Sequence, residues 1–173
     1  MDIEAAMKRI PPHSAEAEQA VLGAMLINKD AVMVASEIVT GEDFYQTAYG
    51  ILFDAVVDLF KAGKPVDLIT LQEHLKEKDV PPEVSSLEFA RELLVSTPTS
   101  ANVKYYAEIV RDKAVLRRLI RISEETANTC YLENQPLEEI LEKTEKQVFE
   151  IVEHGHAQEY VPIKQVVLNA LDV

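Results

Sequence analysis

Apolar residues recur at steps of three and four positions along most of this chain, and short polar segments interrupt the pattern. This is the period of an amphipathic α-helix, because strand side chains would alternate instead. Five helices are therefore expected in the first part of the chain, over about residues 14–28, 30–38, 44–62, 67–80 and 85–97.

The ends of these helices are predicted from residues with known backbone preferences. A side-chain oxygen just before a helix accepts hydrogen bonds from its free amide groups, and glycine or proline ends it. The expected N-caps are Ser14, Asp30, Asp67 and either Ser85 or Ser86. The expected stops are Thr40 with Gly41, Gly63 with Pro65, Pro81 with Pro82, and Pro98. Phe44 and Tyr45 are expected to enter the third helix.

One long helix is expected from Thr99 to roughly Asn128, with a length of about 40 Å. Its apolar residues form two stripes on different sides. One stripe is Val103, Ala107, Val110 and Ala114, and the other is Tyr105, Ile109, Leu116 and Ile120. One side can therefore cover the globular body while the other meets a partner. The alternative is a central helix enclosed by its own domain.

A second arm is expected after the turn at 134–136, through about Glu153. Its apolar positions step by 4, 3, 4 and 3, at Leu137, Leu141, Thr144, Val148 and Ile151. So narrow a seam suits pairing with another helix. The two arms are predicted to form a hairpin that packs on itself and then on a second copy of the chain.

The C-terminal part is predicted to be a linker followed by a docking helix. Residues 154–161 have no helical pattern, and Pro162 then begins an apolar face of Ile163, Val166, Val167, Ala170 and Leu171. A helix this short is marginal alone in water. It is expected to dock on another subunit or domain, the alternative being that it folds back on its own domain.

The pattern thus predicts an all-α fold, with a globular bundle of about five to six helices, a long hairpin and a separate linker helix. The expected segments are an N-terminal arm (1–13), the body (14–98), the hairpin (99–153), the linker (154–161) and the start of the linker helix (162–173).

Composition narrows the class of protein. With 47% apolar and 27% charged residues the chain should fold, and no run approaches the roughly 20 apolar residues of a membrane span. The acidic N-terminus does not resemble a signal peptide, so a cytoplasmic protein without membrane contact is expected. A single cysteine excludes an internal disulfide. A net charge of −13 opposes general nucleic-acid binding.

A local basic cluster interrupts this acidic chain on the long helix, at Arg111, Lys113, Arg117, Arg118 and Arg121. Apolar residues lie between these charges, as in an interface with apolar anchors and a charged rim. The cluster could bind an acidic partner or nucleic acid, or it could pair with glutamates of the adjacent arm.

A search for reactive groups predicts no catalytic, metal or cofactor site in this chain. The glycine spacing of a phosphate-binding loop is missing. His154 and His156 have no third ligand at helical spacing, and His74 lacks a second histidine four residues on, so a solvated linker and a surface histidine are expected. The serines are better explained as caps.

Several segments resemble the DnaB-type replicative DNA helicases: RIPPHSAEAEQAVLGAML at 9–26, EDFY at 42–45, GKPVDLITL at 63–71, TSANVKYYAEIVRDKAVLRRLIR at 99–121 and PIKQVV at 162–167. The resemblance implies a hexameric, ATP-driven ring that unwinds DNA at the bacterial replication fork. Its N-terminal domains form a collar built as a trimer of dimers. ATP and Mg would bind in a motor domain that this chain lacks, and DNA would meet the full-length ring.

The resemblance also implies roles for particular residues. Candidates for contact with the C-terminal domain of primase are Glu16, Phe89, Arg117, Arg118 and Ile120. The dimer contact would use the hairpin, with candidates Tyr105, Ile109, Leu116, Leu137, Leu141, Val148 and Ile151. The linker helix would dock on a neighbouring subunit's motor domain. The rival hypotheses are a dimeric DNA-binding regulator that uses the basic cluster, and a small hydrolase built from carboxylates and His74.

Overall fold

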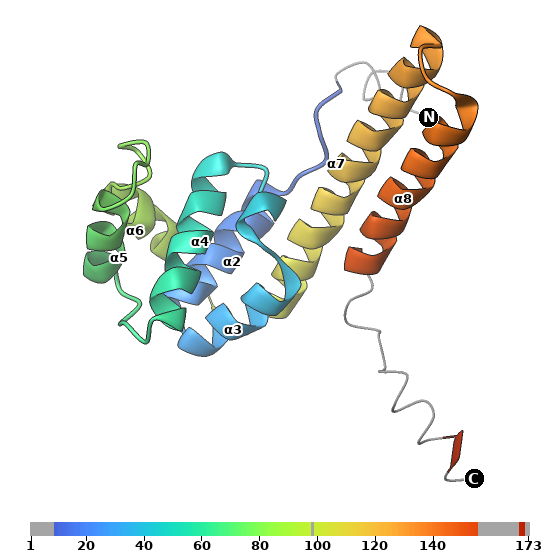
Figure 1. Cartoon of the computed structure of the whole chain (residues 1–173). Helices are drawn as coiled ribbons and strands as arrows, with labels where there is room; N and C mark the ends of the chain where they lie inside the picture. Colours follow the sequence, from blue (N-terminus) through green and yellow to red (C-terminus); the bar gives the residue numbers. More distant parts are fainter. Residues whose placement is uncertain (1–8, 98, 156–169, 172–173) are drawn as a thin grey trace. The chain divides into compact units, whose positions relative to one another are not determined.

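A computed structural model describes residues 9–97, 99–155 and 170–171, and every regular element of these residues is helical, as predicted (Figure 1). The elements in order are α2 (Ala15–Ile27), α3 (Lys29–Ile38), the 3₁₀ turn η1 (Gly41–Asp43), α4 (Thr47–Lys61), α5 (Leu68–Lys76), α6 (Leu87–Ser96), α7 (Val103–Leu132) and α8 (Leu137–Gly155). The chain divides into two compact units, 1–116 and 117–173.

The predicted N-caps are confirmed at three helices. Ser14 Oγ accepts from Ala17 N at 3.2 Å, Asp67 Oδ1 accepts from Thr70 N at 2.8 Å, and Ser86 Oγ accepts from Phe89 N at 3.3 Å. The prediction for Asp30 is wrong. Asn28 caps α3 instead, because its extended backbone precedes Lys29 and its Oδ1 accepts from Asp30 N at 2.9 Å.

The third predicted helix begins later than the sequence indicated. Phe44 and Tyr45 precede α4, in a connection that follows η1. The buried carboxylate of Glu18, on α2, accepts hydrogen bonds from the backbone N–H groups of Tyr45 and Gln46. These amides are therefore satisfied by another element. The predicted stop at Gly63 is confirmed, because Gly63 has the positive φ of 68° that follows many helix ends.

The core of the first unit lies among α2, α3 and α4, with apolar side chains from α5, α6 and the beginning of α7. Its closest approach is between α2 and the end of α6, where a Cβ atom on Gly23 would lie 1.7 Å from Thr97 Oγ1. Only glycine allows the two segments to come this close. The contact fixes the end of α6, just before the connection to α7.

The long helix is confirmed, but it is displaced by four residues at both ends relative to the prediction. Residues 99–102 form a turn in which Thr99 Oγ1 accepts from Ala101 N at 3.1 Å, so α7 begins at Val103. The stripe of Val103, Ala107, Val110 and Ala114 is buried, and the stripe of Tyr105, Ile109, Leu116 and Ile120 is exposed. A helix enclosed by its own domain is therefore excluded.

Candidate self-association surface

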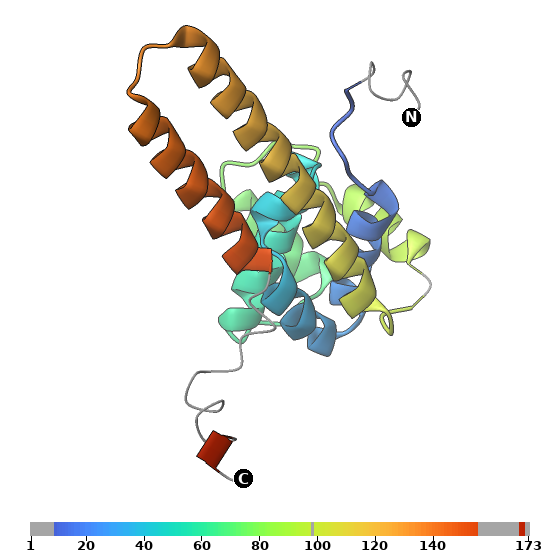
Figure 2. The same ribbon diagram turned by 90° about the vertical axis from the view of Figure 1, so that its right-hand side faces the viewer.

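Residues 117–132 of α7 and the whole of α8 form an antiparallel helical hairpin, and the two arms lie side by side in both views (Figures 1 and 2). Residues 133–136 join them. Glu133 adopts a left-handed conformation with a φ of 49°, and Pro136 O accepts from Ile140 N at 3.2 Å in the first turn of α8. The turn thus reverses the chain within four residues.

The two inner sides of the hairpin are marked by reduced exposure. On α8 these positions are Ile140, Thr144, Gln147 and Ile151, which step by 4, 3 and 4 residues. On 117–132 they include Ile122, Thr126 and Thr129, at steps of 4 and 3. The structure therefore divides the predicted seam, since Thr144 and Ile151 lie on the inner side while Leu137, Leu141 and Val148 are exposed.

A second stripe on each arm is exposed. On α7 it consists of the small residues Ser123, Ala127 and Cys130, and on α8 of the apolar residues Leu137, Leu141, Val148 and Val152. At about 100° per residue, each stripe is rotated about its own helix axis by roughly a quarter turn or slightly more from the inner side, in the same sense on both helices. Because the helices are antiparallel, this rotation brings the two stripes to the same side of the hairpin. We call this surface the hairpin face.

The opposite side of the hairpin is polar. There α8 has Glu139, Lys143 and Glu150, and α7 has Glu125 and Asn128, all exposed. The hairpin is thus a two-helix layer with one apolar and one charged surface. Leu137 and Leu141 are 69% and 59% exposed in a single copy, which is costly for large apolar side chains in water.

The residues predicted for the dimer contact fall into two groups. Tyr105, Ile109 and Leu116 are exposed along α7, on the same side of the helix as Ile120. Leu137, Leu141 and Val148 are exposed on α8, within the hairpin face. Ile151 differs, because it is only 8% exposed and is already covered within one chain. Their role in dimerisation stays a prediction.

The residues predicted for primase contact are distributed over the two units. Arg117, Arg118 and Ile120 share one turn of α7, where Ile120 is exposed and both arginines already interact within the chain. Glu16 is exposed on α2. Phe89 is half-buried instead.

The Phe89 ring has a structural partner. It stacks on Tyr49 with a centroid distance of 5.5 Å, and the Tyr49 hydroxyl accepts from Gln19 Nε2 at 2.8 Å. These contacts connect α6 to α4 and α2. Phe89 is therefore only partly accessible to a partner protein.

The predicted docking helix can be described only in part. Ile163, Val166 and Val167 lie outside the described residues, whereas Ala170 and Leu171 are exposed, Leu171 by 75%. Docking of this segment stays a prediction.

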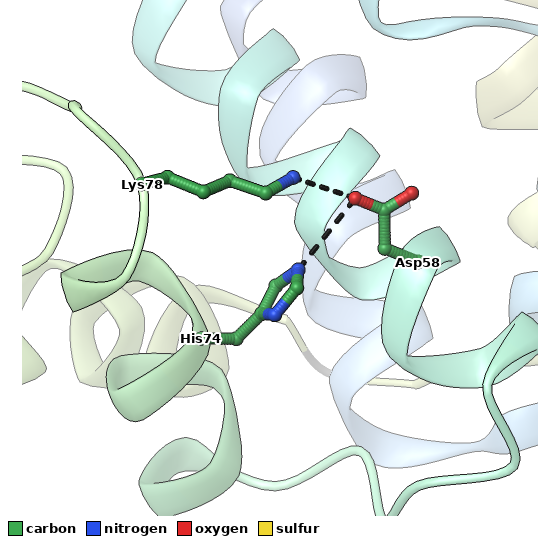
Figure 3. A network of polar contacts seen from close by, with 3 residues as sticks. All are labelled: Asp58, His74 and Lys78. Atoms are coloured by element: carbon green, nitrogen blue, oxygen red, sulfur yellow. Dashed lines mark hydrogen bonds and ion pairs between the residues drawn. The ribbon is translucent and has the colours of Figure 1, made fainter.

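A polar network of the first unit was missed by sequence analysis (Figure 3). Lys78 Nζ donates to Asp58 Oδ2 at 2.6 Å, and His74 Nε2 lies 3.6 Å from the same oxygen. The hydrogen bond from Lys78 lowers the pKa of Asp58. The prediction of a surface His74 is wrong, because its side chain is 21% exposed and faces a carboxylate of α4. The network connects α5 and the residues after it to α4.

A second carboxylate of α4 has the opposite behaviour. Burial raises the pKa of Asp54, and a hydrogen bond from the backbone N–H of Gly41 partly offsets this effect. Neither carboxylate is near a set of metal-binding side chains. Among the residues that the structure describes, no group of three or more His, Cys, Asp or Glu could hold a metal ion.

The basic cluster of α7 is partly engaged. Arg111 Nη2 lies 3.3 Å from Asp112 Oδ1, an exposed pair between sequence neighbours. Arg121 is exposed, and Lys113 is half-buried. Within the described segments, no helix is sufficiently long and apolar to span a membrane.

Fold and surface together define an all-helical protein with a core among its first helices and a hairpin that exposes apolar side chains on one face. The profile of the family described as "DnaB-like helicase N terminal domain" matches residues 10–112. The chain belongs to this family.

Curated relatives agree with this assignment. The replicative DNA helicase DnaB of Geobacillus stearothermophilus is 38% identical over 165 residues, which are 95% of this chain and 36% of the relative. The DnaB helicase of Pasteurella multocida (strain Pm70) is 41% identical over 145 residues, or 83% of this chain and 31% of the relative. The chain thus spans about a third of the length of these relatives.

Solved structures show the same fold. The N-terminal domain of DnaB helicase from Mycobacterium tuberculosis superposes with a TM-score of 0.77 at 32% identity, covering 82% of this chain and 99% of that one. The corresponding domain from Helicobacter pylori, described together with its interactions with primase, has a TM-score of 0.58 at 17% identity, covering 76% and 99%. The second similarity concerns the fold alone.

Proposed function

We propose that this chain is the N-terminal collar of a hexameric, ATP-dependent replicative DNA helicase that unwinds duplex DNA at the bacterial replication fork. The observation that carries the proposal is the hairpin face, which exposes the large apolar side chains of α8 on a chain that belongs to the DnaB-like N-terminal family. A second copy would cover this face in a two-fold contact, and three such dimers would close the collar.

The other parts of the helicase lie outside this chain. ATP and Mg would bind in the motor domain, which would also carry out hydrolysis, and DNA would meet the full-length ring. Residues 162–173 would dock on the motor domain of a neighbouring subunit, in agreement with their apolar spacing. The contribution of this chain is architectural: it brings subunits together and presents a surface to a partner.

The partner we propose is the C-terminal domain of primase. Ile120 would be an exposed apolar anchor with Arg117 and Arg118 beside it, and Glu16 on α2 is a further candidate for contact with primase. An exposed apolar side chain flanked by arginines is typical of interfaces. The fold shared with the Helicobacter pylori domain, which is described with its primase interactions, supports this choice. Phe89 would contribute only its accessible part.

Self-association is tested by Leu141→Glu, which places a charge within the hairpin face. At about 0.5 M salt, we expect wild-type chain to sediment as a dimer and the variant to sediment as a monomer at the same concentration, because a buried unpaired carboxylate is costly. Lys143→Glu is the matched control, since it adds a glutamate to the polar side of the same helix. A dimer that survives Leu141→Glu would exclude the hairpin face as the contact.

Primase binding is tested by replacing Arg118 and Ile120 together with alanine. Calorimetric titration with the cognate primase C-terminal domain should show an affinity reduced by about tenfold or more, as expected for an interface anchor. Ile69→Ala is the control, because Ile69 is an equally apolar, exposed residue of α5. Unchanged affinity in a folded double variant would remove both residues from the site.

A further inference from the structure

The hairpin, together with the turn of α7 that precedes residue 117, has two outer edges of opposite charge. The acidic edge lies on α8 and consists of Glu138, Glu142, Glu145 and Glu153 around Phe149. At about 100° per residue these five positions fall within roughly 80° of arc, on the side of the helix opposite Ile140, Thr144 and Ile151. All of them are exposed. The acidic edge therefore points away from the other arm.

The basic edge lies on α7 and consists of Lys113, Arg117 and Arg121, spaced four residues apart. These positions also span about 80° of arc, on the side of α7 away from Ile122, Thr126 and Thr129. Arg117 is engaged within the chain. Among the residues that the structure describes, Lys113 and Arg121 form no ion pair.

The two edges have net charges of opposite sign. The acidic edge has four glutamates, which gives −4, and the basic edge has one lysine and two arginines, which gives +3. In the described part of the chain no glutamate of α8 forms an ion pair. Since the edges are on opposite outer sides of the two helices, neither can neutralise the other within one copy.

Phe149 adds an exposed aromatic ring to the charged groups of the acidic edge. Its ring is 57% exposed, and Val152 beside it is 50% exposed. An aromatic ring surrounded by carboxylates suits an arginine, because the guanidinium can stack on the ring and pair with the rim. Arg121, exposed on the basic edge, has this chemistry.

We propose that the acidic edge of one copy binds the basic edge of another copy. The contact is heterologous, since it joins two different surfaces, and it leaves the hairpin face free for two-fold pairing. It rests on the proposed collar, in which it would be the lateral contact that connects one dimer to the next. Because exposed ion pairs are screened by salt, the lateral contact should weaken at high ionic strength while the apolar dimer persists.

The test uses two charge-reversed versions of the full chain, Lys113→Glu with Arg121→Glu, and Glu142→Lys with Glu145→Lys. Sedimentation velocity at about 0.05 M salt should show wild-type species larger than the dimer, and these should revert to dimers at about 0.5 M. Each variant alone should remain a dimer, with a lateral dissociation constant raised by at least about tenfold. An equimolar mixture should recover the larger species, because one variant then supplies two acidic edges and the other two basic edges.

Controls separate this contact from the dimer. Lys64→Glu and Glu77→Lys reverse exposed charges outside the hairpin and should sediment as wild type. Circular dichroism of each variant checks that it folds. Wild-type chain that never exceeds the dimer at low salt, variants that assemble normally, or a mixture that does not recover would each overturn the lateral contact. Loss of the dimer itself in Leu141→Glu tests only the hairpin face.

Discussion

At the residue scale, the pattern of apolar positions predicts which side chains are buried. Close contacts between residues distant in the sequence decide which positions tolerate a substitution. Gly23 lies inside α2, where alanine would normally favour the helix. The buried Thr97 hydroxyl occupies the space that a methyl group would need, and it donates to Leu93 O at 2.8 Å. Nothing near Gly23 in the sequence indicates this neighbour, which is 74 positions away.

Gly23→Ala should therefore destabilise the chain. Overpacking of this kind costs about 1–3 kcal/mol or more, which exceeds the gain of roughly 1 kcal/mol in helix propensity. Urea denaturation followed by circular dichroism measures the difference. Glu37→Ala, at an exposed position of α3, should change stability by less than about 0.5 kcal/mol. A Gly23→Ala chain more stable than wild type would contradict the contact.

At the scale of elements, caps and proline positions predicted most helix ends, and the errors have identifiable causes. Asn28 and Asp30 can both cap a helix, and only the backbone conformation distinguishes them. Phe44 and Tyr45 were assigned to α4 because the effect of the buried Glu18 comes from another helix. The division of the α8 seam depends on which side meets α7, and the spacing of one arm alone does not contain this information.

The connection between α5 and α4 should depend on pH through Asp58. Its pKa is lowered in the folded chain, so the stabilisation is present above the unfolded pKa of about 3.9 and is lost as pH falls through the folded value. Lys78→Met should cost about 0.2–1 kcal/mol near neutral pH, because both side chains are partly exposed. The difference from wild type should shrink as pH falls through the folded pKa of Asp58.

Thermal unfolding of wild type and Lys78→Met across this pH range measures the effect, with Lys64→Met as the control for loss of an exposed lysine. Asp54 has the opposite effect on the pH dependence. Its raised pKa contributes stability at low pH that is lost as pH rises. The charge of Lys78 lowers the pKa of Asp54 as well as that of Asp58, so removing the lysine raises the pKa of both carboxylates and changes their contributions in the same direction. A difference in stability between wild type and Lys78→Met that stays constant at all pH values would contradict the role of Asp58.

At the scale of the whole molecule, the sequence predicted an all-helical fold, and the described elements and membership of the DnaB-like N-terminal family agree with it. The sequence could not assign residues such as Leu141 and Ile151 to different sides of the hairpin. Their apolar character is the same, and only the packing of the two arms separates the exposed side chain from the covered one.

If the hairpin face pairs in solution, unfolding should be coupled to dissociation. The midpoint of thermal unfolding of wild-type chain should then rise with protein concentration, since mass action favours the dimer. Leu141→Glu should unfold at a midpoint independent of concentration. Differential scanning fluorimetry over a hundredfold concentration range is sufficient. A concentration-independent midpoint in wild type would show that unfolding is not coupled to the dissociation of a dimer.

Cys130 is the single thiol of this chain, and it is exposed within the hairpin face, near the end of α7. The wild-type polypeptide can therefore accept a thiol-reactive fluorophore at one defined position, without any engineered substitution. A small dye at that position would sense a change of solvent as subunits meet, whereas a bulky adduct would obstruct their approach. The same atom thus offers chemists both a reporter and a block for assembly.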